Sequence, residues 1–239
     1  MTQKSVEIGM RGQSIIERTA APLRQQVVRA IREDILNGVL VPGQRLIESG
    51  LCATYGVSRT VIREALRQLE TEHLIRVVPA QGPIVAVLTE AEIRAIYVVR
   101  AALEGLAGRL FAANADQGVT RKMLNLRKRL IADYRDGTVQ SREDFKAAFY
   151  AVLLEGGGNP VLADVLGGIH ARIAIFRRFA FVDDDRVRLS FEELDRIIST
   201  CAIQRDPDAA FAACESHIRV AANLALIEYE RRAPGFRGA

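Results

Sequence analysis

The sequence has 239 residues, of which 49% are hydrophobic and 26% are charged, so it can bury the core of one large domain or of two ordinary ones. No apolar run is long enough to span a membrane, and the first residues lack the apolar stretch of a secretion signal, so we expect a cytoplasmic protein with no membrane partner. The net charge is +4. Residues 1–88 contain 11 basic and 8 acidic residues, so +3 of this charge lies in the first 88 residues, which favours a nucleic acid as partner.

Residues 1–20 show no hydrophobic periodicity and are expected to form a loose N-terminal arm. A helix is predicted from Pro22 to Asn37, because apolar side chains recur there at helical spacing and proline suits a first helical turn. Gly38 suits the position after its last turn. A turn over residues 41–43 and a short helix over residues 46–55 follow.

The segment from Gly56 to Glu70 is predicted to form an amphipathic helix, with Ser58 as its N-terminal cap. Its apolar face contains Val61, Ile62, Ala65, Leu66 and Leu69. Its opposite face contains Arg59, Arg63 and Arg67, each four residues from the next. A short helix, a glycine turn and a helix with a basic outer face predict a helix-turn-helix, whose second helix enters the major groove of DNA. Taken alone, the basic face could also be a set of solvated charges.

Two short runs with β-type composition, residues 74–78 and 84–88, flank the turn sequence at residues 79–83. They predict a two-stranded hairpin that forms a wing beside the second helix. We therefore assign residues 21–88 to a winged helix-turn-helix domain that binds DNA.

From Thr89 onward the pattern is almost wholly helical, and Thr89 with Glu92 forms a capping box at the start. The predicted fold is therefore mainly α, with a winged helix-turn-helix followed by an all-α helical bundle over residues 89–239. The expected helices span residues 89–113, 118–135, 141–155, 160–181, 187–205 and 207–232. The cysteines fall in apolar helical patterns without a C-x-x-C spacing, so reduced core thiols are expected at Cys52, Cys201 and Cys214.

The N-terminal segments resemble the GntR family of bacterial transcription regulators. The order and spacing agree over about 65 residues, which is more specific than any single motif. The matching residues are Ile31–Gly38, Pro42–Leu46, Gly56–Thr60, Arg63–Leu66, Leu74-Ile75 and Gly82. The resemblance implies a winged helix-turn-helix joined to an effector-binding domain, in a protein that acts as a homodimer on short palindromic operators.

The second half resembles the FCD, or FadR-type, helical effector domain of that family. The matching residues are Arg100–Glu104, Phe149-Tyr150, Asn159–Leu162, Asp206, Ala210 and His217. Together with the N-terminal match, the resemblance extends from about Pro22 to about Tyr229. It implies that this half binds a small effector and dimerises.

The resemblance places the family's DNA contacts on Arg59, Thr60, Arg63 and Gly82. An arginine can bind guanine O6 and N7 with two parallel hydrogen bonds. Ser58 and Thr60 can bind phosphate near the helix N-terminus, Arg67 extends the basic face, and glycine lets the wing approach the DNA backbone. Where the family has an arginine in the preceding helix, this sequence has Ser49 followed by Gly50, so one contact is expected to be lost.

Many FCD domains hold a divalent metal through one Asp and three His, and this sequence departs from that pattern. By register, the ligands fall on Lys146, Tyr150, Asp195 and His217, of which His217 is the single histidine. A protonated lysine cannot be a ligand, and a neutral tyrosine is a poor one. We therefore expect no metal or other cofactor.

The same register implies that Lys146, Tyr150, Asp195 and His217 face a central cavity and bind the effector, with Arg100 nearby and Arg172 as a further candidate. The Lys146 ammonium would replace the missing cation and pair with Asp195 or with an anionic effector. Arg100 could bind a carboxylate through two hydrogen bonds. The alternative is a structural polar network that satisfies only itself. His73 and His170 are expected to have no functional role.

The predicted function is that of a transcription regulator, and specifically a repressor, whose operator affinity is controlled by a small anionic organic acid. A constitutive DNA-binding regulator with a non-functional pocket is the first alternative. An enzyme is the second, and we do not expect one, because the sequence has no Ser/His/Asp or Cys/His set at helical spacing and no phosphate-binding loop. Gly156–Gly158 lacks the lysine and the strand context of such a loop.

Overall fold

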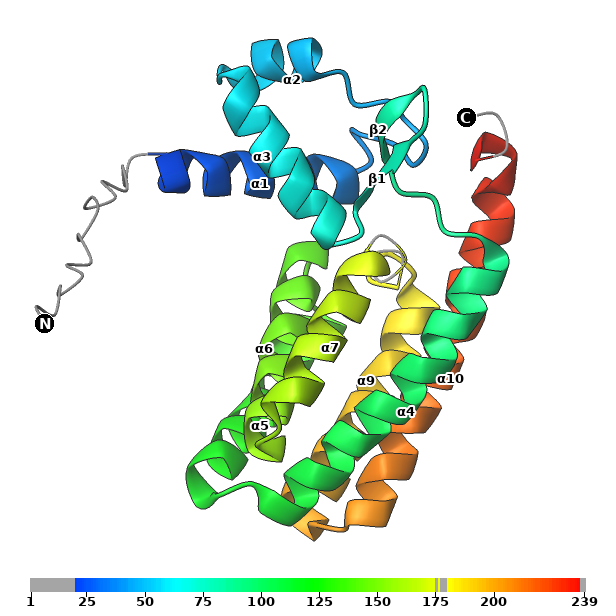
Figure 1. Ribbon diagram of the computed structural model, residues 1–239. Coiled ribbons are helices and arrows are strands. Elements are labelled where there is room, and N and C mark those ends of the chain that lie inside the picture. Colours follow the sequence, from blue (N-terminus) through cyan, green and yellow to red (C-terminus); the bar gives the residue numbers. More distant parts are fainter. Residues whose placement is uncertain (1–19, 175, 177–179, 237–239) are drawn as a thin grey trace, which may run out of the picture.

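The computed structural model describes residues 20–174, 176 and 180–236, and the predicted N-terminal arm lies outside them except for Ala20. Two parts follow each other along the chain (Figure 1). The first contains three helices and a hairpin, and the second is wholly helical among the described residues. The mainly α fold class predicted from the sequence is thus confirmed, and the predicted boundary after residue 88 falls in the segment that joins the hairpin to the second part.

The first part is a winged helix-turn-helix. It comprises α1 (Ala20–Leu36), α2 (Glu48–Tyr55), α3 (Arg59–Thr71), β1 (Ile75–Val78) and β2 (Gly82–Val85). The two strands are antiparallel, with Ile75 opposite Val85 and Val78 opposite Gly82. α1 packs against α3, and the apolar faces of these elements share one core, which includes Ile31, Leu51, Ile62 and Leu69.

The second part is a bundle in which α4 and α10 lie side by side over most of their length (Figure 1). Its elements are α4 (Glu90–Asn114), α5 (Gln117–Arg129), η1 (Leu130–Arg135), α6 (Val139–Gly157), α7 (Pro160–Arg172), α9 (Asp184–Ile198), η2 (Ser199–Gln204) and α10 (Pro207–Phe236). No helix among the described residues is long and apolar enough to cross a membrane.

Local sequence explains where these helices begin. Thr89 and Glu92 form the predicted capping box, in which each side chain accepts a hydrogen bond from the backbone N–H of the other residue. Thr138 and Asn159 cap α6 and α7 in the simpler way, each by accepting one backbone N–H. Two of the expected helices continue into π-helical turns, η1 and η2, and the helix expected over residues 160–181 ends at Arg172.

The contact between α4 and α10 depends on small residues. A Cβ atom on Gly108 would lie 2.7 Å from Cys214 Sγ and 2.9 Å from the carbonyl oxygen of Ala210. The two helices can therefore approach this closely only because residue 108 has no side chain. Cys201 and Cys214 are buried in this region with free thiols, as predicted.

Candidate nucleic-acid interface and effector cavity

The helix predicted to read DNA, α3, has one buried and one exposed face. Ile62, Ala65, Leu66 and Leu69 are buried in the core. The predicted DNA-binding residues of this helix and its cap are all exposed: Ser58, Arg59, Thr60, Arg63 and Arg67. The basic face is therefore available to a partner.

Glycines in the turn before α3 and in the wing adopt backbone conformations that other residues rarely adopt, and Ser58 caps the start of α3. Gly56 ends α2 in the left-handed region with φ +66°, which a residue with a Cβ rarely adopts. Ser58 Oγ accepts a hydrogen bond from the backbone N–H of Val61 at 3.4 Å, as the predicted cap requires. Gly82 has φ +83° and stands at the wing turn, with open space around the position of a Cβ.

Arg63 forms an ion pair with a residue that the sequence analysis did not select. Its Nε lies 2.8 Å and 2.9 Å from the two carboxylate oxygens of Glu48, which stands in the first turn of α2. The hydrogen bond from Arg63 is the main reason why the pKa of Glu48 is lowered. The sequence predicts only that α2 and α3 lie close together, which is not enough to identify Glu48 as the partner of Arg63.

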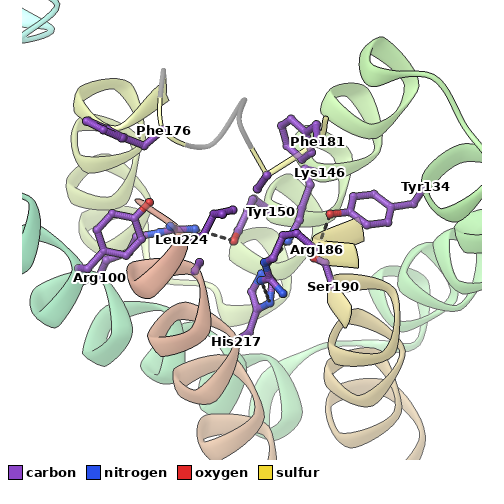
Figure 2. A pocket seen from close by; sticks show the side chains of 13 residues that line it. Arg100, Tyr134, Lys146, Tyr150, Phe176, Phe181, Arg186, Ser190, His217 and Leu224 are labelled. Carbon is purple, nitrogen blue, oxygen red and sulfur yellow. Dashed lines mark hydrogen bonds between the residues drawn. The ribbon is translucent and has the colours of Figure 1, made fainter. Parts of the chain in front are cut away.

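A cavity lies inside the helical part between α4, α6, α9 and α10 (Figure 2). Its polar wall contains Arg100, Lys146, Tyr150, Arg186, Ser190 and His217, and its apolar wall includes Phe176, Phe181 and Leu224. The free space between these side chains, counted for the centres of water molecules, is about 30 Å³. One water needs roughly 10–15 Å³ on this measure, so the cavity in this conformation holds only a few waters.

A buried ion pair supports one side of the cavity. Arg100 Nε donates to Glu104 Oε1 at 2.5 Å, and both side chains are 3% exposed. Glu104 also bonds with His170 Nε2 at 2.9 Å, while Arg100 Nη2 donates to the Tyr150 hydroxyl at 3.0 Å. His170, which was expected to have no role, is therefore part of this network and lies against the Tyr150 ring.

A second network joins three helices on the other side. Glu193 Oε2 binds His217 Nδ1 at 2.5 Å and Arg186 Nη1 at 2.9 Å. The other ring nitrogen, His217 Nε2, lies 2.7 Å from Lys146 Nζ. Because Nδ1 faces a carboxylate, we assign the proton of the neutral ring to Nδ1, and Nε2 then accepts a hydrogen bond from Lys146.

The electrostatics of this network favour a neutral His217. Burial, together with the charge of Lys146, lowers the pKa of His217 to about 4 despite the hydrogen bond to Glu193. Burial alone would raise the pKa of Glu104, but the charge of Arg100 and the hydrogen bond from His170 outweigh it and hold the pKa below its usual range. The pKa of Glu193 is lowered in the same way, by His217 and Arg186 against burial.

Both ring nitrogens of His217 have protein partners in this arrangement. Lys146 Nζ lies against Nε2 and Glu193 against Nδ1, and either nitrogen would have to lose its partner before it could bind a metal. Among the described residues, no group of three or more His, Cys, Asp or Glu side chains is arranged to hold a metal ion.

Two of the predicted effector-binding residues lie elsewhere. Asp195 is 39% exposed and binds Arg127 through two hydrogen bonds of 2.6 Å and 2.9 Å, so the predicted pairing of Asp195 with Lys146 is wrong. Arg172 does not line the cavity, and its charge instead acts on Glu92 in the first turn of α4. At Asp195 the reason is geometric, because a shift of two residues turns a helical side chain by about 200°. Arg172 was proposed from its position in the helix alone, and it also lies two residues from the inward position. Glu193 and His170 occupy the inward positions instead.

Sequence reasoning missed Arg186, which lines the cavity, and three residues that bind or contact lining residues from behind the wall: Glu104, His170 and Glu193. For two of them the sequence did contain a signal. The buried face of α9 includes Val187, Ser190 and Leu194, and helical spacing places Arg186 and Glu193 close to that face. Asp195 falls outside it.

The arrangement of the elements defines a class of protein, namely a winged helix-turn-helix protein with a helical partner domain. Two family models match the chain. The model described as bacterial regulatory proteins, gntR family, matches residues 23–85, and the model described as the FCD domain matches residues 95–220. The chain therefore belongs to the GntR family and carries an FCD domain, and it is a DNA-binding transcription regulator.

Several relatives agree with this assignment. The chain is 30% identical to the HTH-type transcriptional regulator YdhC of Bacillus subtilis, over 74% of this chain and 79% of the relative. It is 26% identical to the HTH-type transcriptional repressor RspR of Escherichia coli, over 83% and 86% of the two chains. Among solved structures, E. coli McbR/YncC has the same fold, with a TM-score of 0.72 at 20% identity over 87% of this chain and 98% of that one.

Proposed function

We propose that this regulator is a cytoplasmic repressor that binds a palindromic operator as a homodimer and releases it when a small organic acid enters the cavity of the FCD domain. Two relatives support the repressor role by their names, RspR and the gluconate operon transcriptional repressor of Bacillus licheniformis, which is 39% identical over half of this chain. We further propose that the FCD domain binds its ligand without transforming it, and without a metal cofactor.

One observation carries the choice of an anionic ligand: the cavity wall offers a hydrogen-bond donor that has no partner. Arg186 Nε is buried and makes no hydrogen bond with any described residue, although the Arg186 side chain is only 6% exposed. A buried donor without an acceptor costs free energy, which an entering carboxylate would recover. Arg100 and Lys146 also line the wall, whereas the carboxylates of Glu104 and Glu193 do not. Three cationic side chains, Arg100, Lys146 and Arg186, therefore line the cavity, and the carboxylates that pair with the two arginines lie behind the wall.

The small volume of the cavity suggests how a ligand would act. An acid of the size of succinate or gluconate is larger than a few waters, so it can enter only if wall side chains or helices move apart. A ligand that binds the expanded arrangement more tightly than the compact one shifts the protein toward the expanded arrangement. We propose that this shift changes the distance between the two recognition helices of a dimer, which must lie about 34 Å apart to occupy successive major grooves.

A thermal-shift screen of the full chain with acetate, lactate, succinate and gluconate, each with and without Zn²⁺, tests this proposal. We expect at least one acid to raise the melting temperature. A ligand at a hundred times its Kd stabilises the folded state by about 2.7 kcal/mol, which in a chain of this size corresponds to roughly 5–10 °C. We expect the shift to disappear in Arg186→Met, because the free donor is lost.

Arg188→Met is the matched control, because Arg188 lies on the same helix but its side chain is 73% exposed. A shift that persists unchanged in Arg186→Met would contradict the proposed site. If no acid shifts the wild-type protein, the constitutive regulator is the better description, since the compact cavity and the satisfied His217 already favour a structural network. We expect no stabilisation by Zn²⁺ alone, and a stabilisation that His217→Ala removes would contradict the proposed absence of a metal.

We propose that the dimer forms through α4 and α7, which lie beside each other (Figure 1). Both helices present apolar side chains that are largely exposed in the single chain, among them Val98 at 72% and Val161 at 70%. We expect Val98→Asp or Val161→Asp to convert a dimer to a monomer in light scattering, and to weaken operator binding because two half-sites are no longer bound together. Ile203→Asp, an exposed position in η2, should leave the dimer intact. Persistence of the dimer in both test variants would place the interface elsewhere.

A further inference from the structure

The ion pair between Glu48 and Arg63 joins the two helices of the helix-turn-helix at the surface that faces DNA. Both carboxylate oxygens of Glu48 contact one atom of the Arg63 guanidinium, Nε, and no hydrogen bond to Nη1 or Nη2 is found among the described residues. The Arg63 side chain is 61% exposed, so its outer end remains open to a partner.

This geometry fixes one edge of the guanidinium and leaves another available. An arginine side chain that points into solvent samples many rotamers, and binding DNA requires one of them. Both contacts from Glu48 end on Nε, so the Nη edge has no hydrogen bond among the described residues, and a pair of N–H groups on this edge can match guanine O6 and N7. The side chain therefore loses less conformational entropy when it binds a base.

We infer that Glu48 is a positioning residue for DNA recognition, which holds the Arg63 guanidinium with its Nη edge directed toward a guanine in the major groove. The inference depends on Arg63 reading DNA. Glu48 would contribute to the choice of sequence without adding a contact to the DNA backbone.

The charge of Glu48 gives this role a recognisable signature. Glu48 lies near both Arg59 and Arg63, so on a surface that must approach phosphates it repels DNA of every sequence. Loss of the carboxylate should therefore strengthen binding to random DNA and weaken discrimination between sequences at the same time. A residue that only stabilised the fold would not produce opposite changes in these two quantities.

The experiment compares Glu48→Ala and Glu48→Gln in the full chain, with a duplex selected from a random-sequence pool by the wild-type protein. Both variants lose the charge, but glutamine keeps an oxygen that can accept from Arg63 Nε. We expect each variant to bind random duplex about two- to five-fold more tightly at low salt. Discrimination against duplexes in which a single G·C pair is replaced should fall by at least about five-fold in Glu48→Ala and much less in Glu48→Gln.

Glu70→Ala is the matched control, because Glu70 lines the same groove between α3 and the wing and has no hydrogen bond with Arg63. It should strengthen binding to random DNA without loss of discrimination. Full discrimination in Glu48→Ala would overturn the inference, as would an equal loss in Glu48→Gln. If Arg63→Ala keeps its discrimination between sequences, Arg63 does not read DNA, and the role of Glu48 fails with it. If Arg63→Ala loses discrimination and Glu48→Ala does not, only the role of Glu48 is rejected.

Discussion

Arg63→Ala is expected to remove sequence-specific operator binding while leaving the protein folded. A well-placed arginine discriminates its base pair by about ten- to a hundred-fold, and a homodimer presents the side chain in both half-sites, so the two losses multiply. The fold should be unaffected, because Arg63 is 61% exposed and Glu48, its ion-pair partner among the described residues, is also on the surface. A gel shift with the selected duplex, together with a thermal melt, measures both quantities.

Arg219→Ala is the control for this variant. Arg219 is also an exposed arginine in a helical ion pair, with Glu215, but it lies on α10 outside the DNA-binding domain. It should keep both the operator affinity and the melting temperature of the wild type. Wild-type operator affinity in Arg63→Ala would show that Arg63 does not read DNA.

The second large effect is expected on stability, from Glu104→Leu. This substitution leaves the Arg100 guanidinium buried at 3% exposure without its carboxylate, and breaking a buried ion pair from one side costs about 3–5 kcal/mol. The free energy of unfolding, measured by urea titration followed by circular dichroism, should fall by that amount. His170 loses a hydrogen bond in the same variant, which adds to the loss.

Two further variants identify the cause. The double variant Arg100→Met with Glu104→Leu removes both charges and should recover most of the lost stability, since replacing a whole buried pair by apolar side chains is often neutral. Glu155→Leu breaks the exposed pair between Lys122 and Glu155, and should cost at most about 1 kcal/mol. If Glu104→Leu cost no more than Glu155→Leu, the pair between Arg100 and Glu104 would contribute little to stability.

The winged helix-turn-helix could be predicted from the sequence because its determinants are local. The Ser58 cap, the turn at Gly56 and the period of Ile62, Ala65 and Leu69 each act within a few residues. Their combined spacing then identifies the family, and the family models cover the same segments.

The cavity could be predicted only in part, because its contacts join residues far apart in the chain. Lys146 and His217 are 71 residues apart and were correctly placed in one cavity by the resemblance. Their bond to each other was not foreseen, since an Asp partner was expected for Lys146. The error at Asp195 came from counting residues back from His217, and a count does not show which face of α9 turns inward. The helical period of Val187, Ser190 and Leu194 contains that information.

The capping box at Thr89 has a mechanical consequence. The segment before Thr89 is attached to the first domain, because the backbone N–H of Ala86 donates a hydrogen bond to the carbonyl oxygen of Leu74 at 2.9 Å. Only residues 87 and 88 therefore lie between this attachment and Thr89, the N-terminal cap of α4. Arg100, in the cavity wall, then lies about 15 Å further along the same uninterrupted helix, at roughly 1.5 Å per residue. One end of α4 is attached to the wing, and the cavity lies partway along the helix. If the proposed ligand tilts α4, we therefore expect the wing to move with it as a rigid extension, without any unfolding.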